Sequence, residues 1–128
     1  MAKKHKLGDL QLAILRRLWR RGEAAAAEVH ADLFDDRGLA PTTIATMLKK
    51  MEAKGVVRHR VSGRRYLYRA TVSEREVTKT MVSEITDRLF QGDPVALVSH
   101  LLQEHEVDAR ELEELKALIE RHETEEIR

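Results

Sequence analysis

The sequence predicts a mainly α-helical protein with one small β-hairpin, and three observations lead to this fold class. Charged residues make up 35% of the 128 residues and aromatic residues only 4%, a composition that favours helices with solvated faces over a large β-sandwich core. Apolar residues recur at helical spacing in most segments. In residues 56–70, by contrast, apolar or aromatic residues alternate with arginines at the two-residue period of a strand before a Ser-Gly turn, and a second strand-like segment follows this turn. This pattern predicts the hairpin.

Two helices are predicted before residue 39. The first is expected from Asp9, as N-cap, to Gly22, and its buried side is expected to hold Leu10, Ile14, Leu15, Leu18 and Trp19. Trp19 at this spacing among leucines is typical of a core residue. The second, in the alanine-rich residues 23–38, is expected to turn Val29, Leu33 and Phe34 inward.

A third helix is predicted from Pro41, which suits a first helical position, to Gly55, which suits a helix end. Spacing predicts one buried stripe, formed by Ile44, Met47, Leu48 and Met51. The opposite side keeps small hydroxyls and amines: Thr42, Thr43, Ala45, Thr46, Lys49 and Lys50. A short helix, a turn with Gly38 and this helix together predict a helix-turn-helix, and the exposed face fits the major groove of DNA.

The hairpin that follows is strongly basic. Val57, His59 and Val61 alternate with arginines along its first strand, and Tyr66 and Tyr68 lie in its second. Its arginines are Arg58, Arg60, Arg64, Arg65 and Arg69. Guanidinium groups match phosphate oxygens well, so we expect this cluster to bind phosphate beside the polar helix, although any single arginine can equally be a solvated surface residue. The fold class is therefore mainly α with a small β-wing, a winged helix-turn-helix.

Three further helices are predicted beyond Val72, opened by Ser73 with Glu76, by Asp93-Pro94, and by Asp108 with Glu111. Their apolar positions are Val77, Met81, Ile85, Leu89, Val98, Leu101, Leu102, Leu112, Leu115, Leu118 and Ile119. No helix has enough apolar surface for a core of its own, which predicts dimerisation through these residues with a second copy. The alternative is a monomer in which the helices fold back on the preceding residues.

Charge divides the chain at the same place. Residues 1–72 contain 16 Lys and Arg against 7 Asp and Glu, a net charge of +9, whereas residues 73–128 contain 7 against 15, a net charge of −8. A basic half attracts polyanions and an acidic half is repelled by them. We therefore predict a DNA-binding domain over residues 1–72 and a helical dimerisation domain over residues 73–128. The basic N-terminal end is either a solvated tail or a contact to DNA.

Several function classes lack support in the sequence. The absence of cysteine excludes disulfides and thiolate metal sites, and no apolar run approaches the roughly 20 residues that span a bilayer. No phosphate loop, HExxH or GxSxG motif occurs, and His100 and His105 are five residues apart, which does not place both on one helical face. We expect a cytoplasmic protein that is not an enzyme and holds no metal or cofactor.

The order of these parts resembles the penicillinase repressor family. The matching segments are LGDLQLAILRRLW, APTTIATMLKKMEAKGVV, SGRRYLYRATVSERE, FQGDPVALVSHLL and ELEELKALI, and they cover roughly residues 7–120. The resemblance implies a homodimeric repressor on a pseudopalindromic double-stranded DNA operator, controlling β-lactam-resistance or stress-response genes. It also implies that the polar face of the third helix, Thr42 to Lys50, contacts DNA and that Arg64 and Arg65 hold its backbone.

Three departures from this family bear on target and trigger. Ala45 stands where members often have a longer polar or basic residue, which predicts a different preferred operator. His100-Leu101 stands where β-lactam-responsive members are cleaved at Asn-Phe after a membrane sensor is triggered, so both outcomes stay open at this position: release of repression by a protease or sensor partner, and release by another signal. The cysteine motifs of copper-responsive members are missing. The alternative function is a winged-helix adaptor or ligand-sensing module that acts through protein–protein interaction.

Overall fold

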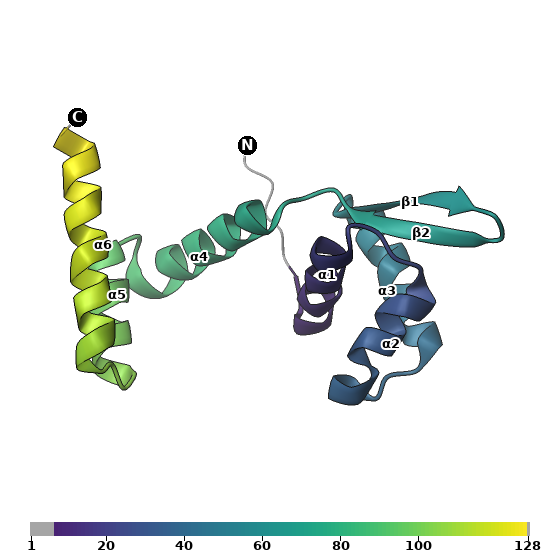
Figure 1. The fold of residues 1–128 in the computed structure, drawn as a ribbon, viewed down its shortest axis with the longest axis horizontal. Helices are drawn as coiled ribbons and strands as arrows, with labels where there is room; N and C mark the ends of the chain where they lie inside the picture. The colour runs from purple at the N-terminus through teal and green to yellow at the C-terminus, as the bar shows by residue number, and fades with distance from the viewer. Residues whose placement is uncertain (1–6, 128) are drawn as a thin grey trace. The chain divides into compact units, whose positions relative to one another are not determined.

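The computed structural model describes the backbone of residues 7–127 and the side chains of this range other than 35–37 and 127. The basic end of the chain, residues 1–6, lies outside the described residues. Along the chain the elements are α1 (Asp9–Arg21), α2 (Ala26–Arg37), α3 (Pro41–Lys54), β1 (Val57–Ser62), β2 (Arg65–Ala70), α4 (Glu74–Phe90), α5 (Pro94–Glu104) and α6 (Ala109–Ile127) (Figure 1). They form two compact units, one ending at Ser83 and the other beginning at Glu84.

The bounds of the first three helices follow from local signals. Pro41 is the first residue of α3, and Gly55 ends this helix in the left-handed conformation at φ 85°. The N-cap predicted at Asp9 is wrong, because Gly8 is the capping residue and Asp9 lies in the first turn, where its carboxylate complements the helix dipole. The turn before α3 is held by His30, whose Nε2 lies 2.6 Å from the carbonyl oxygen of Leu39.

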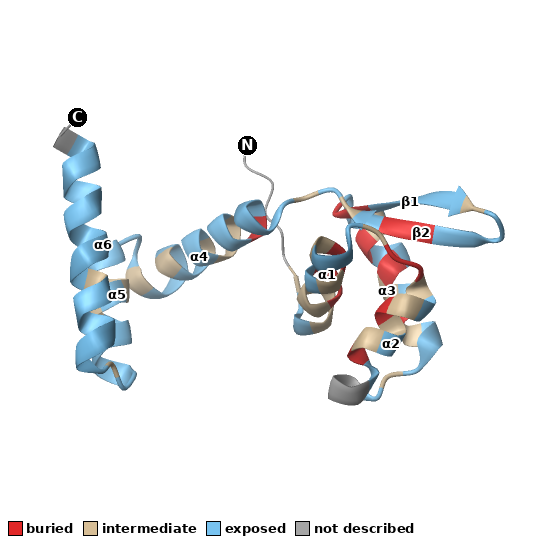
Figure 2. Cartoon of the chain, viewed as in Figure 1, coloured by how far each residue is buried: buried red, intermediate tan, exposed pale blue. Residues whose placement is uncertain are grey.

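The core of the N-terminal unit is formed where α1, α2 and α3 meet the hairpin (Figure 2). The predicted stripe of α3 is confirmed, since Ile44, Leu48 and Met51 are fully buried and Met47 packs against them. The prediction for Phe34 is wrong: this ring is 53% exposed, because the inward side of α2 is filled by Val29 and Leu33. The core also contains Ile14, Leu15, Leu18, Ala24, Val56, Val57, Tyr68 and Val77.

Strands β1 and β2 form an antiparallel hairpin with His59 opposite Tyr68 and Val61 opposite Tyr66. Residues 57–62 form one continuous strand, in which successive side chains point to opposite faces. Val57, His59 and Val61 therefore lie on one face and Arg58 and Arg60 on the other, as predicted. A third segment of the chain also pairs with this sheet, and no pattern in the sequence predicts this pairing. Ala24, between α1 and α2, exchanges both backbone hydrogen bonds with Tyr68, at 2.9 and 2.8 Å. This bridge brings the α1–α2 connection to the outer edge of β2.

The first turns of α4 belong to the N-terminal unit. The indole Nε1 of Trp19 donates to the carbonyl oxygen of Val72 at 2.9 Å, which ties the exit from β2 to α1. The predicted capping box is confirmed, since Ser73 and Glu76 exchange hydrogen bonds at 3.0 and 3.1 Å. Val77 is 1% exposed within the core of this unit.

The second unit contains the rest of α4 together with α5 and α6. Asp93 caps α5 through the backbone N–H groups of Val95 and Ala96, and Asp108 and Glu111 form the predicted capping box of α6. Of the residues from 84 to 126, whose side chains are described, none is buried, and Figure 2 shows α5 and α6 without a red segment. The fold is thus mainly α with a winged helix-turn-helix, as predicted. Within residues 7–127, no helix has both the length and the apolarity to cross a membrane.

Candidate nucleic-acid interface

One side of α3 packs into the core, so its opposite side faces solvent. Thr42, Thr46, Lys49 and Lys50 are exposed, and Thr43 and Ala45 are half-buried. Of the six predicted DNA-contacting residues of this helix, the four exposed ones therefore lie on the side away from Ile44, Leu48 and Met51, and the two half-buried ones flank that side. A face of short hydroxyls ending in two amines offers donors and acceptors to base edges and charge to phosphates.

The end of α3 is joined to the hairpin through a contact between Glu52 and His59. The ring Nδ1 of His59 lies 2.8 Å from both carboxylate oxygens, and the backbone N–H of His59 donates to Oε2 at 3.2 Å. The same imidazole stacks on Tyr66 with ring centroids 4.2 Å apart and an angle of 14° between planes. The hairpin is thus fixed to the helix that presents the polar face.

The tip of the hairpin carries the two predicted wing residues. Gly63 turns the chain with φ 65°, and Arg64 and Arg65 beside it are exposed. No carboxylate of the described residues lies within 4 Å of the Arg64 guanidinium, whereas Arg65 Nη1 lies 3.9 Å from Oε1 of Glu28. The two neighbouring arginines therefore differ in their surroundings.

Arg60 differs from both, because its guanidinium is held by Glu23 in the α1–α2 connection. Its Nε donates to Oε2 at 3.0 Å, and its Nη2 donates to Oε1. The hydrogen bond from Arg60 lowers the pKa of Glu23, and the charge of Arg69 acts in the same direction. Two of the hydrogen-bonding nitrogens of Arg60 are thus occupied within the protein.

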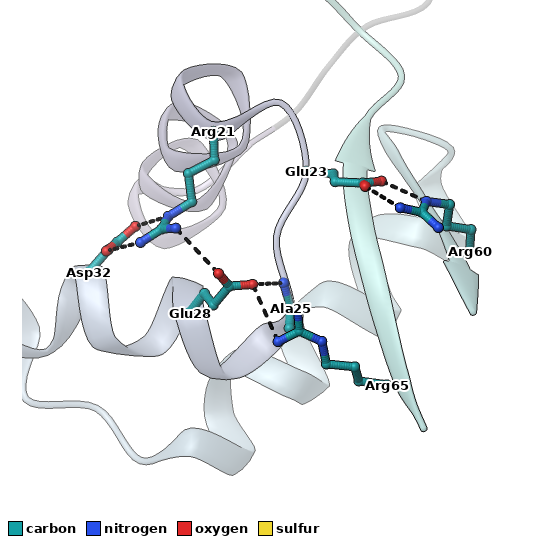
Figure 3. Close-up of polar contacts among 7 residues, drawn as sticks. All are labelled: Arg21, Glu23, Ala25, Glu28, Asp32, Arg60 and Arg65. Atoms are coloured by element: carbon teal, nitrogen blue, oxygen red, sulfur yellow. Dashed lines mark hydrogen bonds and ion pairs between the residues drawn. The ribbon is translucent and has the colours of Figure 1, made fainter. Parts of the chain in front are cut away.

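A second acidic contact lies on α2 (Figure 3). Arg21 makes two hydrogen bonds with Asp32, from Nε to Oδ2 at 2.7 Å and from Nη2 to Oδ1 at 2.9 Å. Its Nη1 lies 3.4 Å from Oε2 of Glu28, and Oε1 of Glu28 accepts a hydrogen bond from the backbone N–H of Ala25 at 2.9 Å. The hydrogen bond from Arg21 lowers the pKa of Asp32.

These acidic partners were missed by sequence reasoning, which singled out the arginines alone. Glu23 and Arg60 are 37 residues apart and meet because Ala24 is paired with β2. Glu28 was visible only as an acidic residue near the start of a helix. Among the side chains that the structure describes, no three His, Asp or Glu residues are grouped so that they could hold a metal ion.

The predicted dimerisation residues fall into two environments. Val77 is buried in the N-terminal core and Met81 packs against it. The others lie in the second unit: Ile85, Leu89, Val98, Leu101, Leu102, Leu112, Leu118 and Ile119 are 40–67% exposed, and Leu115 is half-buried. Helices α5 and α6 also enclose an open apolar groove of about 570 Å³, lined by Pro94, Val95, Val98, Ser99, Leu102, Gln103 and Ile119.

The sequence is similar to known repressors along almost its whole length. The family described as "Penicillinase repressor" matches residues 7–121. The penicillinase repressor of Bacillus licheniformis is 25% identical over 122 residues, covering 95% of each chain. The transcriptional regulator BlaI of Mycobacterium tuberculosis is 34% identical over 125 residues, covering 91% of this chain and 90% of the relative.

Two solved structures resemble part of the chain. The DNA-binding domain of the repressor BlaI is 28% identical with a TM-score of 0.52, covering 59% of this chain and 93% of that domain. The monomeric form of Bacillus licheniformis BlaI in complex with the blaP half-operator is 28% identical with a TM-score of 0.51 and the same coverage. Together with the match over residues 7–121, these similarities assign the chain to the penicillinase repressor family.

Proposed function

We propose that the chain is a sequence-specific transcriptional repressor, not an enzyme, which binds double-stranded DNA as a homodimer at a pseudopalindromic operator. The observation that carries this proposal is the division of α3 into a buried apolar side and an outer side with exposed Thr42, Thr46, Lys49 and Lys50. Family membership supports it, as does the related BlaI in complex with a half-operator.

Within this proposal α3 enters the major groove and the hairpin lies along the backbone. The hydroxyl and methyl groups of Thr42, Thr43 and Thr46 suit base edges and the methyl group of thymine. Lys49 and Lys50, at the other end of this face, suit phosphate oxygens. Ala45 between them adds only a methyl group, which limits its contribution to apolar contact with a base.

Phosphate contacts from the hairpin come from Arg64 and Arg65 in this proposal. Both guanidinium groups are exposed beside the turn at Gly63. Phosphate contacts fix the register of a protein on the duplex without reading its sequence. Binding is therefore expected to weaken steeply as salt is added, because cations are released from DNA when arginine or lysine takes their place.

We assign residues 1–72 to DNA binding and residues 73–128 to dimerisation. The net charges of +9 and −8 support this division, since only the first half attracts DNA. The described side chains from 84 to 126 include no buried residue, although α5 alone exposes Val95, Val98, Leu101 and Leu102. Short helices without an interior need a partner to cover their apolar side.

The partner that fits is a second copy of this chain. Two copies place two recognition helices on one DNA face, and half-sites about one helical turn apart, or a multiple of it, then match the twofold symmetry of the dimer. The apolar groove of α5 and α6 and the exposed Ile85 and Leu89 of α4 are the surfaces we assign to this contact. Since the proposed ligand is promoter DNA, we propose the cytoplasm as the site of action.

The deciding experiment is selection of genomic DNA fragments by the purified full-length chain, followed by sequencing. Recovery of fragments that share a motif with twofold symmetry supports the proposal, and the neighbouring genes identify what is controlled. Failure to retain any duplex at low salt would favour the adaptor function instead, in which the winged helix serves as a scaffold for protein contacts.

A further inference from the structure

Glu28 lies at the point where α1, α2 and the hairpin come together (Figure 3). Its Oε1 accepts a hydrogen bond from the backbone N–H of Ala25 at 2.9 Å. Its Oε2 lies 3.4 Å from Nη1 of Arg21, and Oε1 also lies 3.9 Å from Nη1 of Arg65. One carboxylate therefore contacts its own helix start, α1 and the wing.

Two of these contacts hold the carboxylate in place. The hydrogen bond to Ala25 belongs to a helix start in which the third residue reaches back to the N-cap backbone. Arg21 is itself fixed by two hydrogen bonds to Asp32. The negative charge at Glu28 thus stays close to the wing whichever way Arg65 turns.

The third contact is of a different kind. At 3.9 Å the separation of Arg65 from Glu28 is too long for a hydrogen bond, so the attraction is between charges alone. The Arg65 side chain is 62% exposed and keeps its N–H groups available. If Arg65 leaves Glu28 for another anion, the Glu28 carboxylate keeps Ala25 and Arg21 as partners. The negative charge of Glu28 therefore does not become unpaired in this exchange.

We propose that Glu28 sets the strength of DNA binding by competing with phosphate for Arg65. This inference rests on the proposed function, because it concerns a wing arginine assigned to the DNA backbone. Carboxylate and phosphate oxygens are both acceptors for guanidinium, and each attracts the same positive charge. DNA therefore binds Arg65 only after the attraction of Glu28 is overcome, which lowers affinity for every sequence alike.

Arg64 provides the internal comparison. It is adjacent in sequence but lies in the turn, whereas Arg65 is the first residue of β2 and is paired with Ser62. None of the described carboxylates lies within 4 Å of the Arg64 guanidinium, whereas Glu28 lies 3.9 Å from that of Arg65. Arg64 can therefore bind phosphate without first leaving a described carboxylate, whereas Arg65 must leave Glu28. Neutralising Glu28 should therefore act on binding through Arg65 and leave the contribution of Arg64 unchanged.

The test uses Glu28→Gln in the full-length protein. The glutamine oxygen can still accept from the N–H of Ala25, since glutamine serves in this helix-start motif as glutamate does. Binding is measured by fluorescence anisotropy with a labelled duplex of random sequence at several salt concentrations. We expect Kd to fall about two- to fivefold, the range typical of one exposed ion pair. The salt dependence should become steeper as well.

A double-mutant cycle separates this effect from a general change in charge. In an Arg65→Ala background Glu28→Gln should leave Kd unchanged, whereas in an Arg64→Ala background it should tighten binding as it does in the wild type. A gain that persists in the Arg65→Ala background would overturn the proposal, because removal of any nearby negative charge would then explain it. Weaker or unchanged binding by Glu28→Gln would overturn it too, the former showing that Glu28 orients Arg65 for DNA.

Failure of this inference can be told apart from failure of the proposed function. A folded wild-type protein that binds no duplex at low salt contradicts both. A wild-type protein that binds DNA with a normal salt dependence, but shows no effect of Glu28→Gln, contradicts the role of Glu28 alone. Folding of each variant is checked through the fluorescence of Trp19, the one tryptophan of the chain.

Discussion

The Arg60 guanidinium and the Glu23 carboxylate join β1 to the loop between α1 and α2 through two parallel hydrogen bonds, one of them from Nε to Oε2 at 3.0 Å. These two bonds use the Nε and Nη2 donors of Arg60, a pair of donors that can otherwise bind two oxygens of one phosphate. Although Arg60 belongs to the same basic hairpin as Arg64 and Arg65, it is the arginine that is hydrogen-bonded to the α1–α2 connection. The arginines of the basic cluster thus differ in their contacts within the protein, and we expect them to differ in their contributions to DNA binding.

Replacement of Arg60 by alanine should weaken DNA binding without removing a phosphate contact. We expect a modest rise in Kd, because the hairpin loses one of its attachments, and a salt dependence close to that of the wild type. Anisotropy titrations at several salt concentrations measure both. A clear drop in the salt slope would show instead that Arg60 contacts the backbone directly.

The double change Arg64→Ala with Arg65→Ala should behave differently. Each phosphate contact that is lost lowers the slope of log K against log salt by about 0.9, so the slope should fall by up to roughly 2. Binding to a selected operator and to random duplex should weaken by similar factors, since backbone contacts carry no sequence information. If operator binding alone weakens, the wing reads bases.

Thr43→Ala and Thr46→Ala should instead erode the preference for the operator. A lost base contact costs about 1–3 kcal/mol on the operator, while affinity for random duplex stays near that of the wild type. Competition titrations of operator against random duplex give the ratio directly. Equal losses on both DNAs would remove these threonines from base recognition and leave them with a general role.

Disruption of the second unit should separate the two copies. Ile119→Asp places a charge on the exposed apolar side of α6, where the side chain is 58% exposed and lines the groove. Sedimentation at micromolar concentration should change from dimer to monomer, because a charge buried at an apolar contact is strongly unfavourable. Thr124→Asp, at an exposed polar position of the same helix, should leave the dimer intact. A dimeric Ile119→Asp protein contradicts the assignment.

Acid should weaken the N-terminal unit through Asp32 and Glu23. Hydrogen bonds from Arg21 and Arg60 lower the pKa of these carboxyl groups in the folded protein. A lowered folded pKa gives stability that is present above the unfolded pKa and is lost as the pH falls through the folded value. The free energy of unfolding should therefore decrease below about pH 4, the ordinary range of carboxyl groups.

Urea unfolding followed by Trp19 fluorescence at several pH values measures this effect. Asp32→Asn removes one of the two titrating groups, so this variant should be less stable at neutral pH and lose less stability on acidification. The same acid dependence in Asp32→Asn and in the wild type would show that the contact with Arg21 contributes nothing to it.

Local signals in the sequence were enough to predict the elements. Pro41 and Gly55 bound α3, and the Ser73–Glu76 and Asp108–Glu111 pairs open α4 and α6 where the sequence predicts them. These signals act within one turn of backbone, so they can be recognised without knowledge of the rest of the fold. The exposed face of α3 followed in the same way from helical periodicity.

Contacts between distant segments could not be predicted. Nothing in the residues around Ala24 indicates pairing with Tyr68, and without this pairing the positions of Glu23 and Glu28 beside the wing do not follow. Periodicity has a related limit in α4. It places Val77 and Leu89 on one stripe, yet Val77 is buried in the N-terminal core while Leu89 is 67% exposed. A period identifies a shared face but not what covers it.

The attachment of α4 to the N-terminal core also determines how the protein can be divided for study. A fragment cut after Val72 keeps the acceptor for the Trp19 indole but loses Val77, and the hydrophobic pocket that Val77 fills would open to water. A fragment that extends to Ser83 retains the buried Val77 side chain and the packing of Met81 against the core. The compact unit that contains the wing and its helices thus extends past the change in charge, into a helix whose remaining turns belong to the other unit.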